Sequence, residues 1–187
     1  MGEGAVTAYA ALLRAVNVGG TGVIRMADLK ALCETIGFRD ATTLLQSGNV
    51  VFTAKGSDKT VAQKLAGAIE KSHGFRPTVV VRTADEIADA MARNPFAAEA
   101  KNDPGRLIVA FAAGEPTSGA AARVAAIKVA GERFVLSGRE LYGHYADGQG
   151  RSKVTGTIIE RALGVPATGR NWNTLGKLLA LMEKLEA

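Results

Sequence analysis

The residues Leu-Gln-Ser-Gly-Asn at positions 45–49 run directly into the apolar stretch Val50-Val51-Phe52, and this region is the strongest indication of the fold. A Ser-Gly pair followed by a polar residue, between two apolar runs, is typical of a tight β-hairpin, because glycine takes the positive φ that such turns need. The second half of the chain repeats the pattern, since Val-Leu-Ser-Gly-Arg at 135–139 runs into Leu141-Tyr142. The sequence therefore predicts two hairpins in equivalent positions.

The elements around each hairpin repeat as well. Apolar periodicity, caps and turn residues in the first half predict a strand at 7–16, a helix at 26–36, hairpin strands at 42–46 and 49–53, a helix from Ser57 to Gly74, a strand at 77–82, and a helix opened by a Thr83–Glu86 capping box. The second half predicts a strand at 107–112, a helix at 119–130, hairpin strands at 133–137 and 140–145, a helix at 153–163 that stops at Gly164, an extended piece at 166–168, and a final helix at 173–185.

Each half thus has the order β-α-β-β-α-β with a trailing helix, which is the order of the ferredoxin-like unit. We expect an α+β fold built as a tandem duplication of this unit, each copy with an antiparallel sheet. The N-terminal half would span 1–93 and the C-terminal half 106–187, joined by a linker at 94–105. Helices on one face of each sheet leave the other face open, so we expect the halves to cover these faces by packing together or on the trailing helices, and to form a cleft.

Composition limits the possible functions. The chain has 187 residues, 47% of them hydrophobic, and a net charge of +5 that is spread over both halves. One cysteine excludes an internal disulfide, and two histidines with one cysteine make a soft metal site unexpected. We expect no cofactor, a buried structural Cys33, and no membrane span, because no apolar run approaches about 20 residues. The first residues lack a cationic signal-peptide region, so we expect a cytoplasmic protein.

In the first half, the candidate ligand-binding residues lie at the ends of predicted strands. Arg14 closes an apolar strand, where a buried guanidinium needs a carboxylate, carbonyl groups or an anion. The glycine-rich loop that follows contains Asn17, Gly19 and Gly20, and such loops can direct backbone N–H groups at phosphate. Ser47 and Asn49 belong to the first hairpin turn. The alternatives are an Arg14 stem that reaches water and a simple flexible turn.

Two further groups come from the second half. Arg151, Ser152 and Lys153 lie at the predicted start of a helix, where cations oppose the helix dipole unless an anion binds. Arg170, Asn171, Trp172 and Asn173 precede the last helix, where Asn171 is a natural N-cap and Trp172 a packing anchor. The alternative for the first group is a solvated loop.

The chain shows no plausible Ser/His/Asp set, paired catalytic carboxylates or metal-ligand cluster, so whether it is an enzyme stays open. The leading hypothesis is a protein that binds a phosphate-bearing small molecule or nucleotide in a cleft between the halves. One alternative is nucleic-acid binding through an open sheet face, on which Tyr142 and His144 would be exposed. Another is a protein-interaction or structural module whose strand-end motifs lock turns and caps. The oligomeric state stays open.

Several of these motifs occur together in one family. Arg14 with Asn17-Val18-Gly19-Gly20, then residues 45–52, then Asn94-Pro95-Phe96, then residues 170–174 resemble, in order, the bacterial domain-of-unknown-function family numbered sixteen ninety-seven. The resemblance runs from about Tyr9 to Leu181 and implies a pair of ferredoxin-like units. It implies no activity, substrate or catalytic residue. The chain departs from the family pattern at Ala15, where the family has glycine.

Overall fold

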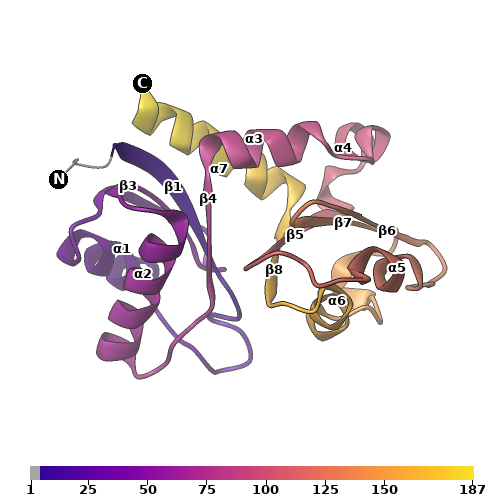
Figure 1. The fold of residues 1–187 in the computed structure, drawn as a ribbon, viewed down its shortest axis with the longest axis horizontal. Coiled ribbons are helices and arrows are strands. Elements are labelled where there is room, and N and C mark those ends of the chain that lie inside the picture. Colours follow the sequence, from indigo (N-terminus) through magenta and orange to yellow (C-terminus); the bar gives the residue numbers. More distant parts are fainter. Residues whose placement is uncertain (1–4) are drawn as a thin grey trace. The chain divides into compact units, whose positions relative to one another are not determined.

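The computed structural model describes residues 5–187, and the chain divides into two compact units (Figure 1). Unit 1 contains the chain up to Ala88 together with Leu178–Ala187, and unit 2 contains Asp89–Lys177. The chain therefore passes from one unit to the other within a helix on both occasions, first in α3 (Ala84–Ala92) and again in α7 (Trp172–Glu186).

Unit 1 is a four-stranded antiparallel sheet in the order β2-β3-β1-β4. Its elements are β1 (Val6–Leu13), α1 (Met26–Thr35), β2 (Arg39–Leu44), β3 (Asn49–Lys55), α2 (Asp58–His73), β4 (Val79–Thr83) and the start of α3. Residues such as Tyr9, Ala11 and Leu13 alternate along β1 and point into a core shared with Leu29 of α1 and Leu65 of α2. One face of the sheet is thus covered by α1 and α2, as Figure 1 shows.

Unit 2 is a second four-stranded antiparallel sheet, in the order β6-β7-β5-β8. Its elements are the end of α3, α4 (Ala97–Asn102), η1 (Pro104–Arg106), β5 (Leu107–Ala112), α5 (Ala120–Ala125), β6 (Glu132–Ser137), β7 (Glu140–Tyr145), η2 (Gln149–Arg151), α6 (Gly156–Leu163), β8 (Ala167–Asn171) and the start of α7, up to Lys177. Ile108 and Ala110 of β5 point into a core shared with Val124 of α5 and Leu163 of α6.

The two sheets have the same topology, because β5, β6, β7 and β8 occupy the positions that β1, β2, β3 and β4 occupy in unit 1. Each unit has the element order and antiparallel pairing of the ferredoxin-like fold. The predicted α+β fold with an internal duplication is therefore confirmed.

Local signals placed most helix ends correctly. The Ser57 hydroxyl accepts the Thr60 N–H at the start of α2, and Gly74 ends that helix with a φ of 74°. The predicted capping box is present, since Thr83 N–H donates to the Glu86 carboxylate and Glu86 N–H donates to the Thr83 hydroxyl. These bonds satisfy N–H groups that a helix leaves without partners in its first turn.

Three segments differ from the prediction. The first strand ends at Leu13 rather than at residue 16, because Ala15 and Asn17 have left-handed φ values of 55° and 56° that a strand does not allow. The predicted helix at 119–130 is helical only over Ala120–Ala125. The expected linker at 94–105 contains α4 and η1, so it is not an irregular connection.

Residues 89–93, which were expected to end the first half, belong to unit 2 together with the segment that follows them. Arg93 donates to the backbone and hydroxyl of Ser137 and to the Glu140 carboxylate, and Phe96 is buried. These contacts attach the segment to the second sheet. No local sequence pattern predicts them, because each joins residues that are far apart in the chain.

Candidate functional site

Two loops of unit 1 that carry predicted site residues are held together by Asn17. Its side-chain amide donates to the Ile24 carbonyl and to the Gln46 carbonyl, both at 2.9 Å, and its Oδ1 accepts the Ile24 N–H. Asn17 therefore closes the glycine-rich loop on itself and attaches it to the turn between β2 and β3.

The turn between β2 and β3 has its own internal bonds. The buried Asn49 amide donates to the Leu44 carbonyl and to the Ser47 hydroxyl. Gly48, with a φ of 81°, accepts the Leu13 N–H through its carbonyl at 2.9 Å, which joins the turn to the end of β1. The structure thus brings Asn17, Ser47 and Asn49 to one end of unit 1.

Arg14 and the two glycines belong to the same end. The half-buried Arg14 directly follows β1, and its N–H donates to the Thr78 carbonyl. Gly19 and Gly20 are exposed, and each has a positive φ with open space where a Cβ would lie. Of the six predicted residues here, the two asparagines have their side-chain amides engaged in holding the loops.

Arg170 of β8 is the predicted residue with the most unusual environment. It is buried, and its guanidinium donates to the Thr168 hydroxyl at 2.6 Å and to the Gly169 carbonyl at 2.8 Å. Burial lowers the pKa of Arg170 to about 10, because water no longer stabilises the charged form.

The residues after Arg170 begin α7. The Asn171 Oδ1 accepts the Asn173 N–H, which is the predicted N-cap, and the Asn171 amide donates to the Gly105 carbonyl. Trp172 is half-buried and Asn173 is exposed. Asn171 therefore has a structural role that explains its presence before the helix.

The third predicted group does not lie at a helix start. Arg151 ends η2, whereas α6 begins only at Gly156, so the prediction that these residues begin a helix is wrong. The Ser152 hydroxyl donates to the Glu132 carboxylate and accepts the Val154 N–H, and Arg151 and Lys153 are exposed. Gly148, with a φ of 87°, and the short η2 turn occupy this segment, so the helix starts further along the chain.

The sheet face of unit 2 that carries Tyr142 is covered at that residue. Tyr142 is fully buried and its hydroxyl donates to the Ala90 carbonyl, while His144 pairs with Asp103 at 3.2 Å. Burial raises the pKa of Tyr142 to about 12. The expectation that Tyr142 is exposed on this face is therefore wrong, because the segment that joins the units lies against the sheet.

Sequence reasoning missed a pocket of about 340 Å³ in unit 1. Its lining combines three cationic side chains from three different elements, Arg39 of β2, Lys55 at the end of β3 and Lys64 of α2, with Thr53 and Phe38. None of the described residues that line it is acidic. We call this the cationic pocket. The three cations are far apart in the sequence, so no local motif predicts that they line one pocket.

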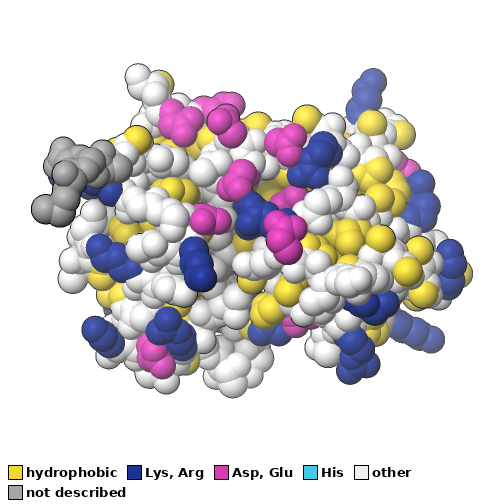
Figure 2. Space-filling view, in the orientation of Figure 1, with side chains coloured by type: hydrophobic (Ala, Val, Ile, Leu, Met, Phe, Trp, Pro, Cys, Tyr) yellow, Lys and Arg dark blue, Asp and Glu magenta, His cyan; other side chains and the backbone are white. Residues whose placement is uncertain are grey.

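Aromatic packing holds one side of the cationic pocket. The ring of Phe38 stacks on Phe52 with centroids 4.3 Å apart, and the Lys64 Nζ lies 5.5 Å from the Phe38 centroid. A cation above an aromatic face is attracted by the ring quadrupole, which favours a position of Lys64 at the pocket. Elsewhere on the surface drawn in Figure 2, Lys and Arg side chains are scattered among other residue types rather than gathered in one patch.

Residues 5–187 contain neither a metal-ligand cluster nor a membrane-spanning helix. In that range, no three His, Cys, Asp or Glu side chains are grouped so that they could hold a metal ion. Within the same range no helix has the length and apolar character needed to cross a membrane. Cys33 is buried as expected, and burial raises the pKa of its thiol to about 12.

The fold and the chain are similar to known proteins. The solved structure of a conserved bacterial protein from Streptococcus pneumoniae has a TM-score of 0.70 and 23% sequence identity, and the match covers 95% of this chain and 99% of that one. At this identity the likeness shows the fold alone. No curated protein matches the chain. The family described as "Protein of unknown function (DUF1697)" matches residues 6–142, which include the two loops at the end of unit 1 but not Arg170. Because this match covers well over half of the chain, the protein belongs to that family of proteins of unknown function.

Proposed function

We propose that the protein binds a phosphate-bearing small molecule and that the cationic pocket of unit 1 is the binding site. The observation that carries the proposal is the convergence of Arg39, Lys55 and Lys64 on one concavity with no acidic lining residue among those described. An anion bound in this pocket would be attracted by all three positive charges.

The size and the donors of the pocket fit such a ligand. A volume of about 340 Å³ lies at the lower end of the range of about 300–1,000 Å³ that small-molecule sites occupy. An arginine offers a planar fork of N–H donors to a phosphate, and a lysine offers a compact charge. Thr53 adds a hydroxyl to the lining. Phe38 is only 3% exposed, so it supplies little ring surface for stacking a nucleobase. This favours recognition of the phosphate group over recognition of a base.

A thermal-shift screen tests the proposal. Inorganic phosphate, ribose 5-phosphate and adenosine monophosphate are compared with ribose and adenosine, which lack the phosphate. A ligand at 100 times its dissociation constant stabilises the folded protein by about 2.7 kcal/mol, which raises the melting temperature by several degrees in a chain of this size. We expect at least one phosphorylated probe to give this shift and its unphosphorylated partner to give none.

Charge-removing variants locate the site. Arg39 and Lys64 are both exposed, so Arg39→Gln and Lys64→Gln leave the core intact. Each substitution should weaken binding about ten-fold, the equivalent of about 1.4 kcal/mol for a lost charge-assisted bond. Lys59→Gln is the matched control, because Lys59 is exposed on the same helix but does not line the pocket. Equal losses in all three variants would mean that only net charge matters and would refute the site.

The ligand-binding role that the sequence predicted for the residues at the strand ends stays a prediction. The bonds of Asn17, Asn49 and Asn171 support the alternative in which these motifs lock turns and caps. On that alternative, Arg14→Ala and Arg170→Ala lower the free energy of unfolding without changing the affinity for phosphate. Binding that survives the Arg39 and Lys64 variants but is lost in Arg14→Ala would transfer the proposal to the end of unit 1.

A further inference from the structure

The two units differ at one sheet edge that their shared topology makes equivalent. In unit 1 the edge strand β2 is interrupted by a register shift between Arg39 and Thr42, and Asp40 there has a left-handed φ of 56°. Bulges and charged residues of this kind protect an edge from pairing with another chain. In unit 2 the corresponding strand β6 pairs with β7 in unbroken register from Glu132 to Ser137. The edge of β6 therefore lacks the bulge that interrupts the edge of β2.

The middle of β6 is apolar. Phe134 and Leu136 are half-buried, and Val135 is 38% exposed. In an antiparallel pair, alternate residues of an edge strand direct their N–H and C=O groups away from the neighbouring strand. This edge thus presents backbone donors and acceptors together with apolar side chains, which is the surface that an added strand recognises.

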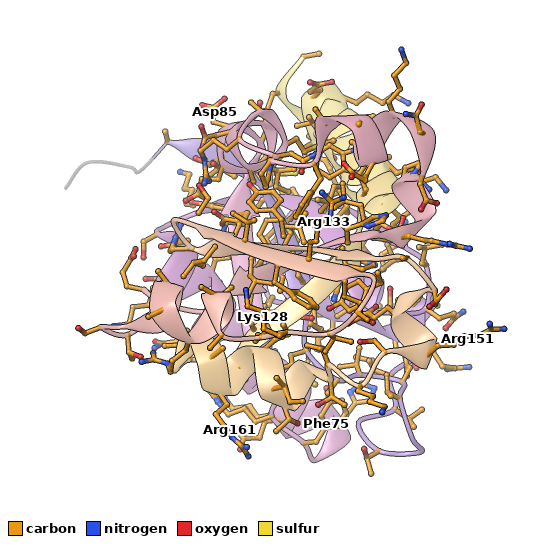
Figure 3. The ribbon with its side chains drawn as sticks, turned by 90° about the vertical axis from the view of Figure 1, so that its right-hand side faces the viewer. Phe75, Asp85, Lys128, Arg133, Arg151 and Arg161 are labelled. Atoms are coloured by element: carbon orange, nitrogen blue, oxygen red, sulfur yellow. The ribbon has the colours of Figure 1, made fainter. Side chains whose placement is uncertain are left out.

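A groove of about 630 Å³ runs beside this strand. The end of α5, the connection that follows it and Phe96 also line the groove. The strand itself contributes residues 132–135. Figure 3 labels Lys128 and Arg133, two cations from this lining. We call this concavity the β6 groove.

We propose that the β6 groove binds an extended, apolar-acidic peptide segment of a partner protein, which adds as a strand to the edge of β6. A strand of six residues offers a pairing length of about 20 Å, from a rise of about 3.4 Å per residue. The alternating apolar side chains of such a peptide would meet Val135 on one face and the apolar α5 side on the other.

The charges of the groove decide the acidic character of the partner. Lys128 is exposed, and Arg133 lies over the Phe96 ring with its guanidinium carbon 4.8 Å from the centroid. Arg133 also pairs with Glu99. Glu132 is the single acidic residue in the described lining, and its carboxylate already accepts the Ser152 hydroxyl. Because Arg133 is already paired with Glu99, Lys128 is the cation of the lining that would attract an acidic side chain of the incoming peptide.

The shape of the groove favours a single extended segment over a second copy of this chain. Phe96 and residues between 124 and 130 line the groove beside the strand, and a second copy would bring the same borders to the contact. A slender peptide has no such borders. The proposal is independent of the phosphate site, because the two sites share no residue.

The test uses a fluorescent seven-residue peptide that alternates valine with glutamate and a counterpart that alternates valine with lysine. We expect the acidic peptide to bind the full-length protein in fluorescence anisotropy and the lysine peptide to bind at least ten-fold more weakly. Binding should slow amide hydrogen exchange along Glu132–Ser137 relative to the free protein. Failure of the acidic peptide to bind, or protection confined to another strand, overturns the proposal.

Two matched variants separate the groove from general surface effects. Val135→Lys places a charge on the edge, whereas Ile158→Lys places the same charge on α6 at a residue of nearly equal exposure, 37% against 38%. We expect Val135→Lys to weaken peptide binding at least ten-fold and Ile158→Lys to leave it unchanged. Equal effects overturn the proposal. Sedimentation that shows a dimer of the wild-type protein, lost in Val135→Lys, would also overturn it, in favour of a second copy as the occupant.

Discussion

Substitution of Gly48 by alanine tests how the end of unit 1 is assembled. An added Cβ would lie 2.4 Å from the Val16 Cγ2 and 2.9 Å from the Leu13 Cβ, and φ at Gly48 is 81°. Both neighbours are buried, so neither can move into solvent. Alanine must therefore adopt a left-handed conformation and push against the core at the same time.

The two costs can be separated with Gly20, which lies in the glycine-rich loop. Its φ is 76°, but nothing lies within 4 Å of the position that a Cβ would take, so Gly20→Ala carries only the conformational cost of about 1–2 kcal/mol. Gly48→Ala carries that cost and an overpacking cost of about 1–3 kcal/mol, in total about 2–5 kcal/mol. We expect the difference between the variants to equal the overpacking cost.

Guanidinium unfolding followed by far-ultraviolet circular dichroism measures both variants. Circular dichroism is needed because the single tryptophan, Trp172, belongs to unit 2 and need not report the unfolding of unit 1. Equal free energies of unfolding for Gly48→Ala and Gly20→Ala would show that the contact with Val16 and Leu13 is not tight. The assembly described for this end of unit 1 would then be refuted.

Three further perturbations have defined outcomes. Ala15→Gly should raise the free energy of unfolding by about 0.5–1 kcal/mol, because φ is 55° there and glycine relieves the strain; a lower denaturation midpoint would contradict this. Burial raises the pKa of Tyr142 and Tyr145 to about 12, above the unfolded value near 10, so their stabilisation is complete below pH 10 and is lost as the pH rises through about 12. An ultraviolet absorbance titration should show that the phenols of Tyr142 and Tyr145 ionise late, and ionisation of both near pH 10 would refute their burial. Arg93→Met should cost about 2–3 kcal/mol in chemical unfolding, since it removes the 2.9 Å ion pair with the buried Glu140; a loss below about 0.5 kcal/mol would mean that the pair behaves as a surface pair.

The fold was predictable because its decisive signals are local. The Ser47-Gly48 turn, the Ser57 cap, the left-handed Gly74 and the Thr83–Glu86 box each act within a few residues. Period-2 and period-3.6 patterns between them assigned the strands and helices. Their repetition in both halves then indicated two copies of one topology.

Contacts made within one loop could also be anticipated, but contacts between loops could not. Asn171 was recognisable as a cap because it bonds a residue two positions away. Asn17 was recognised only as part of a glycine-rich loop, since its bond to the Gln46 carbonyl spans 29 positions. Tyr142 was expected on the exposed face of an open sheet, because nothing near it in the sequence indicates the hydrogen bond to the Ala90 carbonyl.

The element order, the duplication and the family resemblance all depend on neighbouring residues, so they follow from the sequence. The pocket lined by Arg39, Lys55 and Lys64 and the groove between β6 and Phe96 become visible only in the folded chain. Both sites join residues from separate elements, and which side chains meet depends on sheet order, register and helix packing. Those quantities are set by the burial of the whole core, so no short stretch of sequence encodes them.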